Sequence, residues 1–123
     1  MARKLASSTL DRFRRRLTDE REHLEGLLAR FDAEREEVRL SETSSDRSPD
    51  PNTAEGGSLA FELEKELSLE KNARDLLDKV NRALETVDDG TYGICLECGK
   101  AIPVARLDAL PYVTLCVGCA SRR

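Results

Sequence analysis

The chain has 123 residues, of which 36% are charged and 4% aromatic, and its formal net charge at pH 7 is −4. This length suffices for one domain, but the scarcity of bulky apolar side chains excludes a thick globular core, so we expect an elongated molecule. The negative charge gives no general attraction to nucleic acid or acidic lipid, and no segment approaches the roughly 18 apolar residues of a membrane helix, so we expect a protein partner and no membrane.

The first part of the chain carries a heptad stripe of apolar residues. Its members recur every seven positions: Leu10, Leu17, Leu24, Phe31 and Val38. Charged residues separate them, no proline interrupts the segment, and Gly26 is its one glycine. The pattern predicts a continuous helix over about 8–40, near 50 Å long at roughly 1.5 Å per residue. Such a helix must bury its stripe against another element.

A connection and a second helix follow. Two prolines and a glycine pair mark residues 41–57 as an exposed connection. The next stripe has helical spacing and consists of Leu59, Leu63, Leu67, Ala73, Leu77, Val80, Leu84 and Val87. With Ser58 as the predicted N-cap and Gly90 as the predicted C-cap, the second helix is expected over 58–88.

Two helices of similar length with one connection fold most simply into an antiparallel coiled-coil hairpin, in which each stripe covers the other. We therefore predict a mainly α-helical monomer, with the hairpin in residues 1–90 and its tip at 41–57. Glu66 and Glu70 fall on or beside the seam of the second helix. They predict a loosely packed middle, or a seam that faces a third element.

Near the C-terminus, four cysteines form two C-x-x-C pairs separated by seventeen residues: Cys95, Cys98, Cys116 and Cys119. Each pair lets two sulfurs reach one metal ion from a tight turn, and the spacing matches four-thiolate zinc sites. We predict one structural Zn²⁺ in a module of residues 91–123. Because four thiolates leave no open coordination position, and no nucleophile and base occur together, we expect no enzymatic activity.

Other interpretations of the cysteines are two disulfides, a redox-active C-x-x-C, an iron site or four buried thiols. The N-terminus lacks the long apolar stretch of a secretory signal, so we expect a cytoplasmic location, where structural disulfides are rare. No alternation of strands and helices precedes either pair, which disfavours a thioredoxin-like site. The spacing alone leaves iron as an alternative to zinc.

Between the cysteine pairs, the segment from Ile102 to Pro111 is predicted to form a short helix with Pro103 in its first turn. The stretch from Asp89 to Ala120 contains Asp-Gly-Thr-Tyr-Gly-Ile-Cys-Leu-Glu-Cys-Gly and Leu-Cys-Val-Gly-Cys-Ala. It closely resembles the zinc-finger signature of the DksA/TraR family of bacterial transcription regulators. The preceding order of long helix, acidic tip and long helix resembles the larger DksA-type members, so the resemblance covers roughly the whole chain.

The resemblance implies direct binding to bacterial RNA polymerase, and not to a specific DNA sequence, with the zinc module at the rim of the secondary channel and the tip inside. It also makes guanosine tetraphosphate a candidate ligand. Better-known members carry Asp-x-x-Asp-x-Ala at the tip and alter the stability of promoter complexes with its acids. Counting back without gaps from the first cysteine pair places Asn52-Thr-Ala-Glu-Gly-Gly57 there. Glu55 then keeps the second acid, and Asn52 replaces the first. Asp46 and Asp50 are further acids that could supply the lost charge.

Two other function classes are alternatives: a zinc-ribbon module that binds nucleic acid, and a cytoplasmic coiled-coil adaptor. The basic face of the zinc module is weak for the first, and pairing of the stripes between chains would favour the second. His23 stands alone on the charged first helix and is predicted to be a solvated surface residue. Tyr92 and Phe31 are predicted to pack. A solvated face is the prediction for four nearby arginines, Arg12, Arg14, Arg15 and Arg16.

Overall fold

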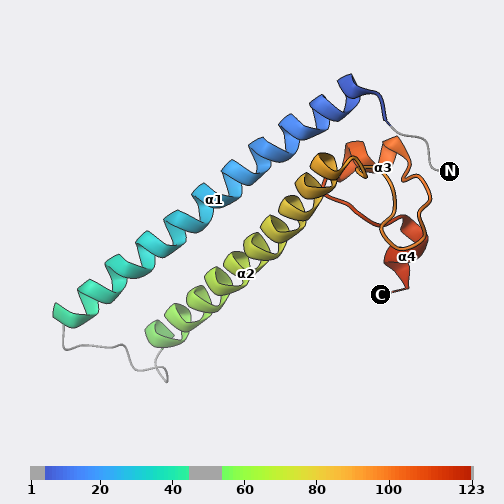
Figure 1. Cartoon of the computed structure of the whole chain (residues 1–123). Helices are drawn as coiled ribbons and strands as arrows, with labels where there is room; N and C mark the ends of the chain where they lie inside the picture. The colour runs from blue at the N-terminus through green and yellow to red at the C-terminus, as the bar shows by residue number, and fades with distance from the viewer. Residues whose placement is uncertain (1–4, 45–53, 123) are drawn as a thin grey trace. The chain divides into compact units, whose positions relative to one another are not determined.

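The computed structural model describes residues 5–44 and 54–122, and of these the side chains outside 42–44 and 54–56. Two long helices are followed by two short ones: α1 (Ser7–Ser44), α2 (Ala54–Asp89), α3 (Val104–Ala109) and α4 (Val117–Ser121) (Figure 1). No strand occurs in the described segments, and none of their helices is long and apolar enough to cross a membrane. The predicted fold, a mainly α-helical antiparallel coiled-coil hairpin with a C-terminal four-cysteine module, is confirmed.

Both long helices extend further than the sequence predicted. Residues 41–44 continue α1 and residues 54–57 begin α2, so Ser58 lies inside a helix and is not an N-cap. Extending an existing helix adds one backbone hydrogen bond for each residue fixed, which offsets the modest helix propensity of Ser and Thr. The glycine pair is tolerated because it lies in the first turn, where backbone N–H groups have no partner within the helix. Pro103 is the N-cap of α3 and does not lie in its first turn.

Residue contacts divide the chain into two compact units. Unit 1 comprises residues 1–23 and 76–123, and unit 2 comprises residues 24–75. α1 and α2 each contribute to both units. The last turns of α2, from residue 76 onward, belong to the same unit as the four-cysteine module. Independent folding of residues 1–90 and 91–123 as a hairpin and a module stays a prediction.

The core of unit 1 is built from the start of α1, the end of α2 and the segment after it. Its most buried side chains come from all three regions: Phe13, Leu17, Val80, Ala83, Val87, Tyr92, Ile102 and Leu107. The ring centroids of Phe13 and Tyr92 lie 5.5 Å apart, and the Tyr92 hydroxyl donates to the Pro111 carbonyl over 2.7 Å. Gly93 has a φ of 85°, and a Cβ there would lie 3.1 Å from the Leu5 side chain. Glycine therefore serves both backbone conformation and close packing at this position.

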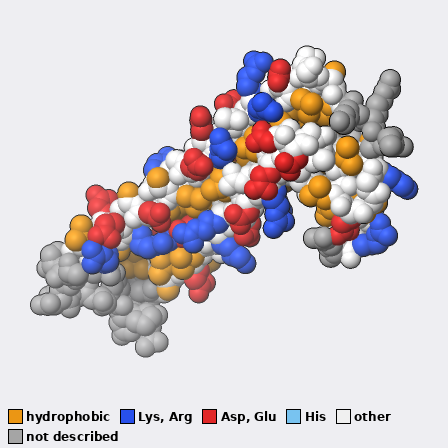
Figure 2. Space-filling view, viewed as in Figure 1, with side chains coloured by type: hydrophobic (Ala, Val, Ile, Leu, Met, Phe, Trp, Pro, Cys, Tyr) orange, Lys and Arg blue, Asp and Glu red, His pale blue; other side chains and the backbone are white. Residues whose placement is uncertain are grey.

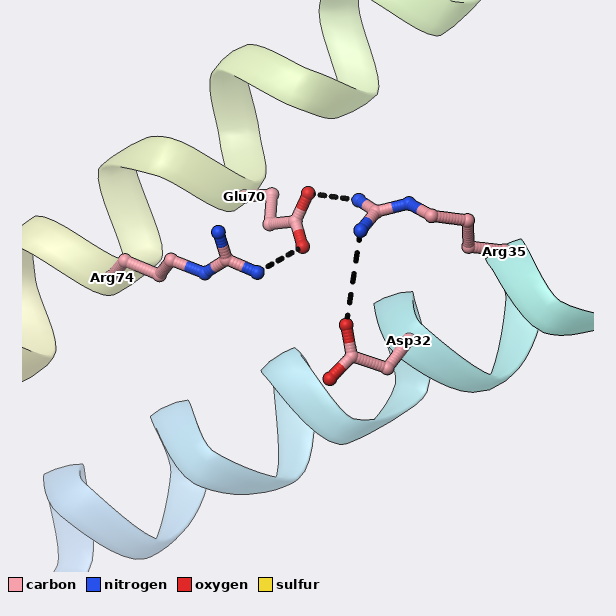
Figure 3. Close-up of polar contacts among 4 residues, drawn as sticks. All are labelled: Asp32, Arg35, Glu70 and Arg74. Carbon is pink, nitrogen blue, oxygen red and sulfur yellow. Dashed lines mark hydrogen bonds and ion pairs between the residues drawn. The ribbon is translucent and has the colours of Figure 1, made fainter.

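Unit 2 contains a buried carboxylate between its two helix segments. Glu70, which is 4% exposed, accepts hydrogen bonds from Arg35 of α1 and from Arg74 of α2, the latter over 2.9 Å (Figure 3). Arg35 also lies 3.9 Å from Asp32. The two arginine side chains remain 52% and 58% exposed, so the acid is buried while its partners reach solvent. The middle of the seam thus holds a network of ion pairs.

The apolar stripes are covered unevenly in unit 2. Leu24 and Ala73 are buried, but many large apolar side chains of this unit are exposed: Val38, Leu40, Leu59, Phe61, Leu63, Leu67 and Leu69. Figure 2 shows hydrophobic side chains interspersed with charged ones on this face of the long helices. An open groove of about 290 Å³ is lined by Phe31, Glu34, Arg35, Glu37, Val38, Leu63, Glu66 and Leu67. The charged residues of this lining would lose hydration if the groove closed, and this cost keeps the groove open to water. The predicted burial of the two stripes is therefore wrong at four positions, which are 47% to 57% exposed: Val38, Leu59, Leu63 and Leu67.

Candidate metal centre

The first cysteine pair lies on a tight turn closed by backbone hydrogen bonds. The Cys95 N–H donates to the Lys100 carbonyl over 2.8 Å, and the Gly99 N–H donates to the Cys95 carbonyl over 3.0 Å. Gly99 has a φ of 73°, a conformation that residues with a Cβ rarely adopt. An antiparallel bridge between Ile94 and Ala101 holds the two ends of the turn together. These contacts fix the backbone from which the first two sulfurs extend.

The second cysteine pair lies at the start of α4. Cys116 is the N-cap of this helix, and its sulfur accepts a hydrogen bond from the Cys119 N–H over 3.5 Å. The Leu96 N–H donates to the Thr114 carbonyl over 2.9 Å, which ties the first turn to the segment that leads into the second pair. The sequence does not predict α4, because five residues are too few to show a helical period.

The four sulfur atoms come together in space. They all lie within 4.8 Å of one another, and Cys98 Sγ and Cys116 Sγ are 3.7 Å apart. Four sulfurs at Zn–S distances of about 2.3 Å define a tetrahedron with edges of about 3.8 Å, so the cluster fits one zinc ion. All four cysteines are free, which argues against the disulfide alternative. Four thiolates fill the coordination shell, so a zinc ion here is structural.

The surroundings of the thiols affect their pKa values differently. The backbone N–H of Cys98, together with two other backbone N–H groups, lowers the pKa of Cys95 to about 6. The Cys119 N–H lowers the pKa of Cys116. The neighbouring Cys116 side chain and burial raise the pKa of Cys119 to about 12, and Arg122 acts in the opposite direction. Because zinc binds thiolates, its binding releases the remaining protons and depends on pH.

An arginine for which the sequence predicted no role at the metal contacts the centre. Arg122 follows α4 as its C-cap residue, and its Nη2 donates to Cys119 Sγ over 3.4 Å. Its Nε donates to the Gly118 carbonyl over 3.3 Å. The spacing of three residues after the last cysteine was the available signal, because residues three apart are neighbours on a helix.

A pocket of about 370 Å³ lies in unit 1 and includes residues that flank the cysteines. It is lined by Lys79, Arg82, Leu96, Arg106, Tyr112, Val113, Thr114, Leu115 and Ala120. The Lys79 ammonium lies 6.0 Å from the centroid of the Tyr112 ring, and Arg106 Nε donates to the Leu115 carbonyl over 3.2 Å. Three cationic side chains and no acidic one favour an anionic ligand. The sequence does not predict this pocket, because its cations are far apart along the chain.

The predicted tip residues lie outside the described side chains. Asp46, Asp50 and Asn52 fall in the segment between the described ends of α1 and α2. Glu55 belongs to the first turn of α2, but its side chain is not among those described. The role of these four residues stays a prediction. His23 is exposed, as predicted.

Three of the arginines predicted to form a solvated face also form ion pairs. Arg12 and Arg16 lie 3.1 and 3.9 Å from the same oxygen of Asp108, and Arg14 lies 3.6 Å from Asp88. The arginine side chains remain 42% to 53% exposed, so each pair contributes at most about 1 kcal/mol. The pairs with Asp108 nevertheless connect α1 to α3 within unit 1.

Sequence comparisons agree with this architecture. Residues 90–123 match the model of the prokaryotic dksA/traR C4-type zinc finger. Over 68 residues, the chain is 40% identical to general stress protein 16O of Bacillus subtilis. This match covers 55% of this chain and 42% of that protein. Over 60 residues, it is 40% identical to the RNA polymerase-binding transcription factor DksA of Escherichia coli. This match covers 46% of this chain and 40% of that protein. Each match spans less than half the length of the relative.

Among solved structures, the chain is similar to transcription factor DksA2 from Pseudomonas aeruginosa. The sequences are 34% identical, the match covers 94% of this chain and 82% of that chain, and the TM-score is 0.68. The zinc-finger match and the clustered sulfurs together support one structural zinc ion, and favour zinc over iron.

Proposed function

Because the chain belongs to the DksA/TraR family of C4-type zinc-finger proteins, we propose that it binds bacterial RNA polymerase directly and regulates transcription initiation. The likeness to transcription factor DksA2, at 34% identity over 82% of that chain, carries this proposal. The Escherichia coli relative is named an RNA polymerase-binding transcription factor, which supports the same partner. The protein acts by binding and not by catalysis, since four thiolates leave its metal without an open position.

In the proposed complex, the zinc module contacts the rim of the secondary channel and the two long helices carry the tip into it. The exposed apolar side chains of unit 2, interspersed with charges, support a protein-binding surface along these helices. Counting back without gaps from the first cysteine pair, we place Asn52 where related tips carry the first acid and Glu55 where they carry the second. We therefore expect binding to polymerase with a weaker effect on open-complex lifetime than members with both acids produce. Asp46 and Asp50 are the other candidate acids of the tip.

Guanosine tetraphosphate is the proposed second ligand of the complex. The pocket that contains Lys79, Arg82 and Arg106 supports this, because Lys and Arg are the side chains that bind phosphate groups. Tyr112 adds an aromatic surface to the same pocket. The protein acts as a cytoplasmic monomer in this scheme, since its two stripes pair within one chain and its partner is the transcription machinery.

Retention of core RNA polymerase by the intact, zinc-loaded chain tests the proposal. A tip variant replaces Asp46, Asp50 and Glu55 by Ala. A matched control makes the same change of charge at three exposed acids of α2: Asp75, Asp78 and Glu85. We expect all three proteins to retain polymerase and to compete with a cleavage factor for the secondary channel. The tip variant alone should lose the effect on open-complex lifetime.

Three results would contradict the proposal in different ways. Failure of the intact chain to retain polymerase would remove the partner. DNA binding without polymerase that falls steeply with salt would favour the nucleic-acid module instead. A stable dimer that does not retain polymerase, detected by light scattering, would favour the coiled-coil adaptor.

A further inference from the structure

The four-thiolate centre carries an excess of negative charge. One Zn²⁺ and four thiolates sum to a net charge of −2, and two of the sulfurs belong to side chains that are almost completely buried, Cys95 at 2% and Cys119 at 1% exposure. Buried negative charge is costly unless hydrogen-bond donors face it. Donors outside the coordinating sulfurs therefore influence how tightly such a centre holds its metal.

The two buried sulfurs have different donors. Cys95 faces backbone N–H groups, including those of Cys98 and Cys116. Among the described residues, Cys119 Sγ has no backbone donor, and its donor from outside the four cysteines is the Arg122 guanidinium at 3.4 Å. One of the two buried cysteines thus depends on a charged side chain for the support that the other receives from the backbone.

The Arg122 side chain is held in place at this sulfur. Its Nε donates to the Gly118 carbonyl over 3.3 Å while its Nη2 reaches Cys119 Sγ, so one guanidinium spans both acceptors. Such a fixed fork suits Arg, whose guanidinium is planar and carries several N–H donors. The Nε of Arg106 is directed to the Leu115 carbonyl and not to a cysteine.

We infer that Arg122 is a charge-compensating residue of the zinc centre: its guanidinium donates to the Cys119 thiolate, offsets part of the net negative charge and slows zinc release. Four sulfurs therefore coordinate the zinc ion, and one cation offsets part of their negative charge. This role concerns metal retention and is independent of binding to polymerase.

Zinc transfer from the full-length, zinc-loaded chain to a chromophoric chelator at neutral pH tests the inference. Arg122→Ala removes both the charge and the hydrogen bonds. Arg122→Lys retains the charge, and Arg122→Gln retains a neutral donor for the Gly118 carbonyl. Lys71→Ala, at an exposed position of α2, removes one positive charge from unit 2 and is the matched control. Circular dichroism of each zinc-loaded variant checks that the helices are intact.

We expect zinc release to be about tenfold faster in Arg122→Ala and in Arg122→Gln. Arg122→Lys should stay within a few-fold of the unaltered chain, and Lys71→Ala should match it. Because the centre is partly exposed, added salt should reduce the difference in zinc release rate between Arg122→Gln and the unaltered chain.

Equal release rates in all variants would overturn the inference. Slow release in Arg122→Gln with fast release in Arg122→Lys would also overturn it, since the hydrogen bond that holds α4 would then be the cause. If Lys71→Ala accelerated zinc release as much as Arg122→Ala, the overall charge of the chain would be the cause and the inference would be overturned.

Discussion

The ion pairs around Glu70 should respond asymmetrically to mutation. The acid side chain is 5% exposed, whereas those of Arg35 and Arg74 are 52% and 58% exposed. If both arginines are replaced by Ala, a buried carboxylate loses its charged partners. If Glu70 is replaced by Leu, two arginines that already reach solvent return to water. Replacing the two arginines should therefore cost much more stability than replacing Glu70.

The expected magnitudes follow from this difference in burial. Leaving one member of a buried ion pair without its partner typically costs about 3–5 kcal/mol. We expect the double variant Arg35→Ala and Arg74→Ala to lie near the lower end, at about 3 kcal/mol, because shortened side chains admit water to the carboxylate. Glu70→Leu should change the free energy of unfolding by less than about 1 kcal/mol, since a hydrophobic side chain of similar volume can replace a buried charge.

Urea unfolding of the zinc-saturated chain, followed by far-UV circular dichroism, measures both effects. Arg39→Ala is the control, because Arg39 pairs with Glu36 on the exposed face of α1 and should leave the midpoint unchanged. Equal slopes of the unfolding curves would justify comparing midpoints. If Glu70→Leu destabilised the protein as much as the double arginine variant, the ion pairs would be net stabilising and the asymmetry argument would be wrong.

Three further predictions concern the metal and the tip. Cys95→Ser should release zinc and unfold residues 91–121 while most of the helical signal remains, which metal analysis and circular dichroism would show; retained zinc would contradict a four-thiolate site. Zinc retention should fall as pH falls and most steeply below a pH of about 6, because the Cys95 thiol of the metal-free chain, whose pKa is lowered to about 6 from 9.0, then binds a proton that zinc must displace; release unaffected by acid in a chelator titration would oppose this. Asn52→Asp should strengthen the effect on open-complex lifetime without a large change in polymerase affinity, and Glu55→Ala should weaken it. If neither changed the lifetime while binding persisted, Asp46 or Asp50 would carry the tip, or the tip would be inert.

Periodicity and spacing in the sequence were enough to predict the two long helices and the metal centre. Leu17 and Leu24 of the first stripe are buried as expected, and the two C-x-x-C pairs bring their four sulfurs together. Both patterns are local, because a helical period and a ligand-bearing turn depend on residues close to one another in the chain. Helix ends were less predictable, since residues 41–44 and 54–57 are extended by the helices that adjoin them.

The tertiary structure decided which of the patterned side chains are buried and what they meet. Glu70 lies among apolar stripe positions, yet it is buried because Arg35, 35 residues away, reaches it from α1. Val38 continues the first stripe, yet it is exposed beside a groove that charged side chains also line. Arg122 follows the last cysteine, but the fold decides that its guanidinium points to a sulfur. The sequence alone determines the periodicity of a helix and its candidate ligands, whereas burial and charge pairing depend on the residues that another segment places opposite.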